Sequence, residues 1–115
     1  MLEPVVMRNL IAGGWASLRF EPFREGITIS RLIDGTPAVA VLRYAAGARV
    51  PLHEHVGPEM IVVLDGAQSD EHGTYRSGDC VINRAGSRHS VWSDTGCVVL
   101  LNWSQSVRFL EADSG

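Results

Sequence analysis

Two histidines separated by one residue, His53 and His55, are prominent in a chain that contains only four histidines. Side chains alternate between the two faces of a β-strand, so these imidazoles point the same way if the segment is extended. Glu59 follows a Gly-Pro turn signal, which predicts that the chain turns back and brings this carboxylate to the histidine pair across a hairpin. Imidazole nitrogens and carboxylate oxygens are common ligands of transition metals.

A third imidazole completes the candidate site. His89 follows a glycine-containing turn and begins another short β-like run. Three imidazoles and one carboxylate on converging strands predict a site for one divalent transition metal, namely zinc, iron, manganese or nickel. Zinc would be satisfied by these four ligands, whereas a six-coordinate ion would keep two positions for other molecules. The remaining histidine, His72, lies in a polar turn, which indicates a solvated side chain and not a second metal site.

The segments that must position these residues are short and β-like. Residues 27–33 alternate apolar and polar side chains, and residues 38–44, 60–64 and 97–103 are short apolar runs. Glycine-containing turn signals separate such segments at intervals of about ten residues. This pattern predicts an all-β fold, either a sandwich or a barrel, in a single domain.

Composition and length limit the possible partners. The 115 residues include ten Lys and Arg against 13 Asp and Glu, and the basic residues are scattered, which argues against nucleic acid as a partner. The first residues have neither a signal-peptide pattern nor a membrane span, so we expect a cytoplasmic protein without membrane contact. We expect an extra strand or arm over residues 1–14, a barrel over 15–110 and a disordered tail over 111–115.

The spacing of the candidate ligands resembles two motifs of the cupin superfamily. The matching residues are Gly47, His53, His55, Glu59 and Gly66 in the first motif, and Gly78, Gly86 and His89 in the second. Two positions of the second motif differ, because Arg84 stands where proline is usual and Ser93 stands where asparagine is usual. The loss of proline removes a residue that would fix the loop before His89.

Within the cupins, residues from about Trp15 to Trp103 look most like the cupin domain of ChrR-type anti-sigma factors and their stand-alone relatives. The resemblance implies a double-stranded β-helix, or jelly roll, and frequent pairing into homodimers. It also implies one divalent metal held by His53, His55, Glu59 and His89. ChrR-type regulators grip the sigma factor through a separate zinc-binding segment with paired cysteines. That segment has no counterpart here, so we expect no direct sigma-factor binding.

Two functions are compatible with these residues. Resemblance to cupin dioxygenases implies an Fe(II)-type enzyme acting on a small chelating diketone or hydroxyaryl ketone, although no separate catalytic residue is evident. The alternative is a ChrR-like metal-dependent sensor or ligand-binding module in stress or transcriptional regulation, without catalysis. Either function requires a small-molecule pocket, and the candidate pocket residues are Tyr44, Ile61, Arg84, Val91 and Asn102.

Overall fold

The computed structural model describes residues 2–110, which form ten β-strands and one short 3-10 helix. In chain order the elements are η1 Gly14–Ser17, β1 Glu21–Arg24, β2 Ile27–Ile33, β3 Ala38–Tyr44, β4 Arg49–Glu54, β5 Glu59–Asp70, β6 Gly73–Arg76, β7 Cys80–Asn83, β8 Arg88–Trp92, β9 Cys97–Trp103 and β10 Arg108–Phe109. The tail expected at residues 111–115 lies outside the described residues.

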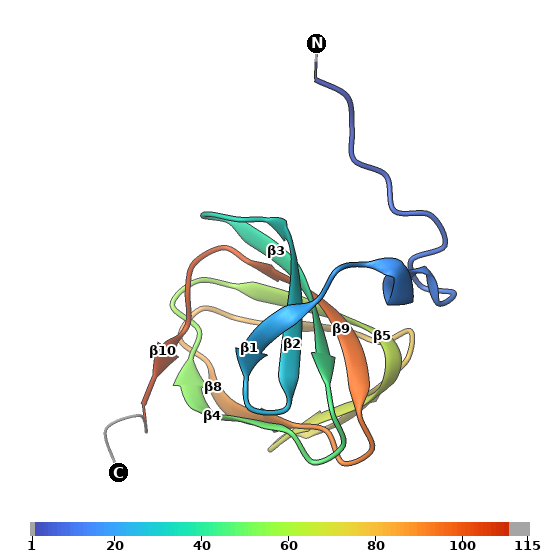
Figure 1. The fold of residues 1–115 in the computed structure, drawn as a ribbon. Helices are drawn as coiled ribbons and strands as arrows, with labels where there is room; N and C mark the ends of the chain where they lie inside the picture. The colour runs from blue at the N-terminus through green and yellow to red at the C-terminus, as the bar shows by residue number, and fades with distance from the viewer. Residues whose placement is uncertain (1, 111–115) are drawn as a thin grey trace.

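The strands form a curled antiparallel sheet that closes around one interior (Figure 1). Its order is β1-β2-β3-β9-β5-β8-β4-β10, and β6 and β7 each pair with β5. β5 is the longest strand and belongs to both halves of the barrel. Its first part pairs with β9 and β7, and its last part pairs with β6 and β8. The predicted all-β jelly roll is confirmed.

A β-bulge in β5 changes which of its residues face the interior. The pairing of β5 with β9 shifts register between Val63 and Asp65. Before the bulge, Ile61 and Val63 point into the inner core. After it, the buried inward positions are Gln68 and Asp70, because one extra residue reverses the alternation of faces. The single strand therefore places odd-numbered and then even-numbered side chains inside the barrel.

The inner core consists of apolar side chains from both halves of the barrel. Ile29, Val63 and Val99 are completely buried there. Ile27 and Ile29 both point inward, as the alternation of residues 27–33 predicts. Tight packing of these branched side chains holds the strands that position the site, because interiors of this kind tolerate few voids.

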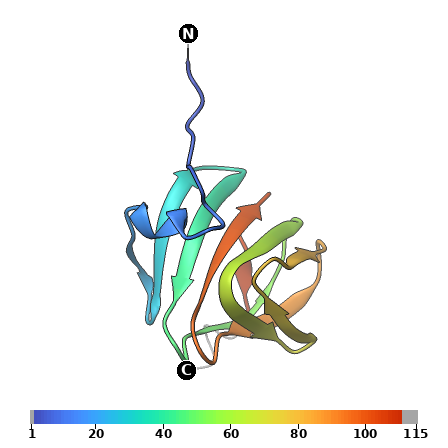
Figure 2. The same ribbon diagram turned by 90° about the vertical axis from the view of Figure 1, so that its right-hand side faces the viewer.

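The N-terminal segment covers part of the barrel's outer face. Val41, Leu64 and Val98 form a small outer cluster against which Trp15 and Phe20 pack. Residues 2–13 contain no strand, and they lead through turns into η1 after an extended arm that projects from the barrel (Figure 2). Within residues 2–110, no helix has the length and hydrophobicity needed to span a lipid bilayer.

Candidate metal centre

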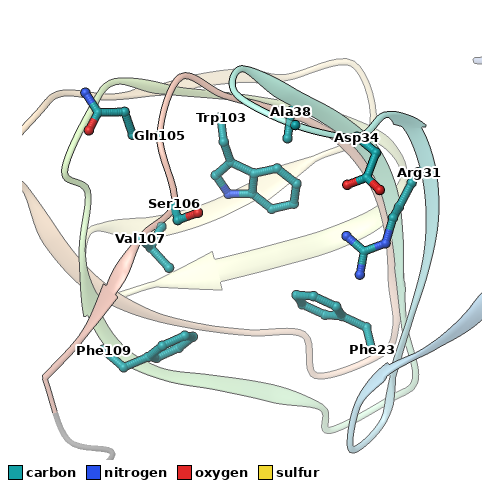
Figure 3. A pocket seen from close by; sticks show the side chains of 10 residues that line it. Phe23, Arg31, Asp34, Ala38, Trp103, Gln105, Ser106, Val107 and Phe109 are labelled. Atoms are coloured by element: carbon teal, nitrogen blue, oxygen red, sulfur yellow. The ribbon is translucent and has the colours of Figure 1, made fainter.

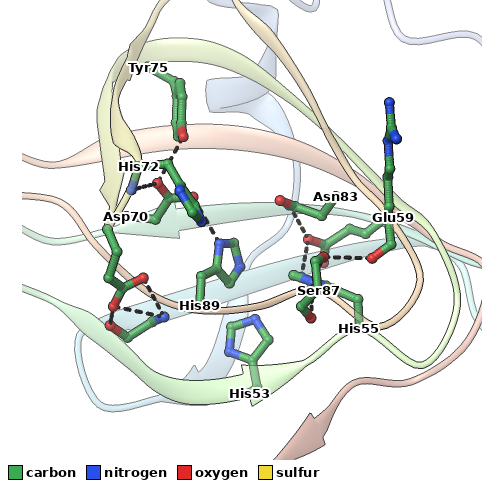
Figure 4. Close-up of polar contacts among 12 residues, drawn as sticks. His53, His55, Glu59, Asp70, His72, Tyr75, Asn83, Ser87 and His89 are labelled. Atoms are coloured by element: carbon green, nitrogen blue, oxygen red, sulfur yellow. Dashed lines mark hydrogen bonds and ion pairs between the residues drawn. The ribbon is translucent and has the colours of Figure 1, made fainter.

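Three histidine side chains meet inside the barrel. His53 lies in β4, His55 directly follows that strand, and His89 lies in β8 opposite His53. Their ring centroids are 4.6 to 5.1 Å apart, and all three side chains are buried. One ring nitrogen from each lies within 4.8 Å of the others, a grouping that could hold a metal ion (Figure 4).

A second bulge aims the histidine pair inward. The pairing of β4 with β8 shifts register between Val50 and His53. Val50 and His53 are three residues apart, yet both point into the barrel, because the extra residue reverses the alternation. His53 and His55 then share one face, as their spacing predicts.

Each imidazole forms a hydrogen bond through its Nδ1 atom, which fixes the orientation of the ring. His53 Nδ1 lies 2.9 Å from the Pro51 carbonyl oxygen, and His55 Nδ1 lies 3.1 Å from that of Ser87. His89 Nδ1 lies 2.9 Å from Oδ2 of Asp70. Carbonyl and carboxylate oxygens only accept hydrogen bonds, so each Nδ1 carries the proton and each Nε2 keeps a lone pair. This tautomer is the one that binds a metal through Nε2.

The Nε2 atoms support the same conclusion. Those of His55 and His89 are buried and make no hydrogen bond to residues 2–110. Glu59 Oε1 is 3.1 Å from His55 Nε2, but the two atoms are not aligned for a hydrogen bond. Buried polar atoms without a partner are uncommon in native proteins. A divalent cation between these atoms would satisfy the lone pairs, so the donor set fits a transition metal.

Glu59 reaches the histidines by a different route from the one expected. The sequence predicts contact across a hairpin, but the described neighbours of β4 are β8 and β10, and Glu59 begins β5. The prediction is wrong because the chain crosses to the other side of the barrel after His55 and does not pair back on β4. The carboxylate therefore approaches through the interior. Asn83 Nδ2 donates a hydrogen bond of 3.1 Å to Glu59 Oε1 and fixes its position.

Asp70 is a buried carboxylate that sequence reasoning missed. Its Oδ2 accepts from His89 Nδ1, and its Oδ1 accepts from the Tyr75 hydroxyl and the His72 backbone N–H, both at 2.8 Å (Figure 4). Burial opposes ionisation, but these three hydrogen bonds hold the pKa of Asp70 below its usual value. Burial and the neighbouring Asp70 raise the pKa of Tyr75 to about 12. Asp70 is therefore an anion that orients His89.

The loop before His89 is fixed without the usual proline. Ser87 donates to the Arg84 carbonyl from its backbone nitrogen at 3.0 Å and from its hydroxyl at 2.6 Å. The backbone of His55 pairs with the same loop, accepting from Gly86 at 2.7 Å and donating to Ser87 at 2.9 Å. Gly86 has φ +88°, a conformation that favours glycine. The Arg84 side chain is exposed, so its backbone is the part that supports the site.

An inner chamber of about 60 Å³ adjoins the histidines. Three of the predicted pocket residues, Tyr44, Ile61 and Val91, line it. Burial raises the pKa of Tyr44, which keeps its phenol neutral. Asn102 is elsewhere: it is exposed on the outer face of β9, opposite Met60 of β5. Its neighbour Leu101 takes the inward position.

A larger outer pocket of about 310 Å³ shares lining residues with the inner chamber. Phe23, Trp103 and Phe109 line both cavities and point toward their common space (Figure 3). β10 pairs with β4 so that Phe109 lies opposite His53, with 5.8 Å between the ring centroids. Arg31 is at the edge of the pocket. The histidine cluster therefore lies beside a space lined by aromatic side chains.

Acid is expected to release a bound metal ion. Burial lowers the pKa of His53 below its ordinary value of 6.5, and the two neighbouring imidazoles lower it further. Protons compete with metal for imidazole nitrogen, so metal should be retained at neutral pH and lost as the pH falls below the ordinary histidine pKa of 6.5. Metal analysis after desalting at a series of pH values measures this loss. Circular dichroism of the same samples provides the control, and metal retained down to the pH of unfolding would contradict the prediction.

Comparison with known proteins agrees with this geometry. A model of the ChrR Cupin-like domain matches residues 10–107. A chain in the crystal structure of Rhodobacter sphaeroides SigE in complex with the anti-sigma ChrR is 26% identical, with a TM-score of 0.69 over 76% of this chain and 49% of that chain. No curated protein sequence matches.

Two further structures share the fold. An acetylacetone dioxygenase from Acinetobacter johnsonii is 17% identical, with a TM-score of 0.78 over 100% of this chain and 82% of that chain. A protein of unknown function with a cupin-like fold from Ralstonia eutropha is 20% identical, with a TM-score of 0.68 over 75% of this chain and 60% of that chain. The chain thus spans 49% to 60% of the length of the Rhodobacter and Ralstonia relatives.

Proposed function

Because the chain belongs to the family of ChrR cupin-like domains, as its motifs predict, we propose that it binds one divalent metal ion and acts as a small-molecule dioxygenase. The substrate class is a chelating diketone or hydroxyaryl ketone. One observation carries the proposal: three imidazoles, each hydrogen-bonded through Nδ1, lie with one ring nitrogen of each within 4.8 Å of the others, beside a chamber lined by aromatic side chains.

His53, His55, His89 and Glu59 are the proposed ligands. The two partnerless Nε2 atoms and the nearby Glu59 oxygen support this set. An Fe(II) ion bound there would supply Lewis acidity and the redox capacity that reaction with O₂ requires. Asn83 and Asp70 then act as positioning residues, since each holds one ligand side chain through a hydrogen bond.

The two cavities favour the hydroxyaryl ketone over the simple diketone. The inner chamber, about 60 Å³, is small, and the outer pocket of about 310 Å³ is in the size range of small-ligand sites. Phe23, Trp103 and Phe109 surround the outer space, and aromatic rings pair favourably with other aromatic rings. The two oxygens of the substrate therefore enter the inner chamber, while its ring stays among these side chains and excludes water.

The proposed activity is tested with an oxygen electrode. Fe(II)-loaded protein is expected to consume O₂ when given ortho-hydroxyacetophenone or acetylacetone, with the aromatic ketone preferred. Zn(II)-loaded protein should bind the same compounds without consuming O₂, because zinc has no accessible redox change. Glu59→Ala should suppress turnover by weakening the metal site. A flat trace across a panel of chelating ketones would contradict the enzyme assignment.

A flat trace would favour the second candidate, a metal-dependent sensor or ligand-binding module. Membership of the ChrR cupin-like family and the 26% identity to a chain of the SigE–ChrR complex support this candidate. Its ligand would occupy the same cavities, and binding without turnover would be its signature. In either case the proposed partner is a second copy of the chain, forming a homodimer.

A further inference from the structure

Gln68 is a buried polar residue to which no role has yet been assigned. It lies in β5 after the bulge, two residues before Asp70, and its side chain lines the inner chamber beside His53 and His89. The residue is only 3% exposed. Its Nε2 makes no hydrogen bond to any residue in 2–110, which makes it the third buried polar atom without a partner, after those of His55 and His89.

The surroundings of Gln68 do not compensate for this isolation. Leu42, Ile61 and Val91 line the same chamber and offer no hydrogen-bond acceptor from their side chains. The Tyr44 hydroxyl is one polar neighbour, and the Gln68 amide partly counteracts the rise in the Tyr44 pKa, but Gln68 Nε2 still lacks a hydrogen-bond partner among the described residues. An amide NH₂ carries two donors, and an unused buried donor is costly. The buried Gln68 Nε2 donor is satisfied only when the chamber holds a hydrogen-bond acceptor.

We propose that the Gln68 amide donates a hydrogen bond to an oxygen of the ligand in the inner chamber and so selects oxygen-bearing, anionic ligands. The inference rests on the proposed function, because it assumes a ligand whose oxygens lie beside the histidines. The acceptor is the phenolate or enolate oxygen of a chelating ketone, since hydrogen bonds to charged oxygens are the stronger ones. A ligand that fills the chamber without an acceptor gains nothing from Gln68.

The test compares two probes on Zn(II)-loaded protein by calorimetry. Gln68→Leu removes the donor and replaces the amide by an apolar side chain of similar size. It should weaken binding of ortho-hydroxyacetophenone by about ten-fold to a hundred-fold, the usual effect of losing a hydrogen bond to a charged group. Pyridine, which has no acceptor left once its nitrogen binds metal, should bind both proteins equally. Gln68→Glu should weaken binding of the ketone at least as much, because a carboxylate repels the phenolate.

The outcomes separate this inference from the proposed function. Metal content should match the wild-type protein in Gln68→Leu, because Gln68 holds no metal ligand, and the melting temperature should be equal or higher, because the variant removes an unused buried donor. Gln68→Met serves as a second neutral variant if leucine prevents folding. Wild-type affinity for the ketone in either neutral variant would overturn the role of Gln68 and leave the metal site standing. Failure of the wild-type protein to bind metal or ketone would overturn both proposals.

Discussion

Replacing His89 by alanine is expected to abolish metal binding and to remove the thermal stabilisation that metal provides. His89 is one of the three clustered histidines, so its loss leaves two imidazoles. An ion that binds only the native state contributes about 4 kcal/mol when its free concentration is a thousand times Kd. For a domain of this size, that corresponds to a rise in Tm of the order of 15 °C. Metal analysis and thermal melts with and without EDTA measure both effects.

The chain offers a matched control for this experiment. His72 is the one histidine outside the cluster, and its side chain is exposed in the turn between β5 and β6. His72→Ala should therefore bind metal and melt like the wild-type protein. His53→Ala should behave like His89→Ala, because the two residues face each other across β4 and β8. Full metal occupancy in both cluster variants would refute the assignment of the site.

Asp70→Asn is expected to lower metal affinity by about ten-fold to a hundred-fold, the usual cost of losing a partner behind a metal-binding histidine. Asp70 accepts from His89 on one oxygen and from both Tyr75 and His72 on the other. An asparagine has a single oxygen and an NH₂ group, so it cannot accept on both sides. If its NH₂ faces His89, the imidazole proton moves to Nε2 and blocks the metal. If its oxygen faces His89, the other two donors lose their acceptor.

Chelator competition measures the affinity, and nitrogen NMR of the histidines reports which ring atom of His89 carries the proton. A shift of that proton to Nε2 in Asp70→Asn distinguishes a positioning role from a general loss of stability. Tyr75→Phe removes one donor and should have a smaller effect in the same direction. Asp94→Asn, at an exposed turn, should have none. An unchanged Kd in Asp70→Asn would contradict the positioning role.

The fold class and part of the candidate site could be predicted from the sequence. Short apolar runs separated by glycine turns predicted an all-β sandwich or barrel, and the resemblance to ChrR-type cupin domains implied a jelly roll of that family, both of which are confirmed. The alternation of side chains predicted that His53 and His55 share a face. This prediction holds because the two residues are only two apart and the register shift of β4 lies before them, between Val50 and His53.

The tertiary structure decided which other residues join the site. Alternation along β5 from Glu59 would place Gln68 and Asp70 on the outside, but the bulge at Val63 and Asp65 reverses the faces and turns both inward. In the apolar run of β9, pairing with β5 exposes Asn102 and buries Leu101. No residue type marks the reversal in β5, because a bulge is set by how two distant strands come into register.

The aromatic lining beside the site also depended on contacts between distant parts of the chain. Phe23 comes from β1, Trp103 from the end of β9 and Phe109 from β10, and each resembles an ordinary apolar residue in its own segment. Closure of the barrel brings these three side chains together beside the histidines. The same closure places the Glu59 side chain in the interior, next to His55. The residue types and their local spacing determined what chemistry the chain can perform. Long-range strand pairing determined which side chains surround that chemistry, because only pairing across the barrel fixes register, bulges and closure.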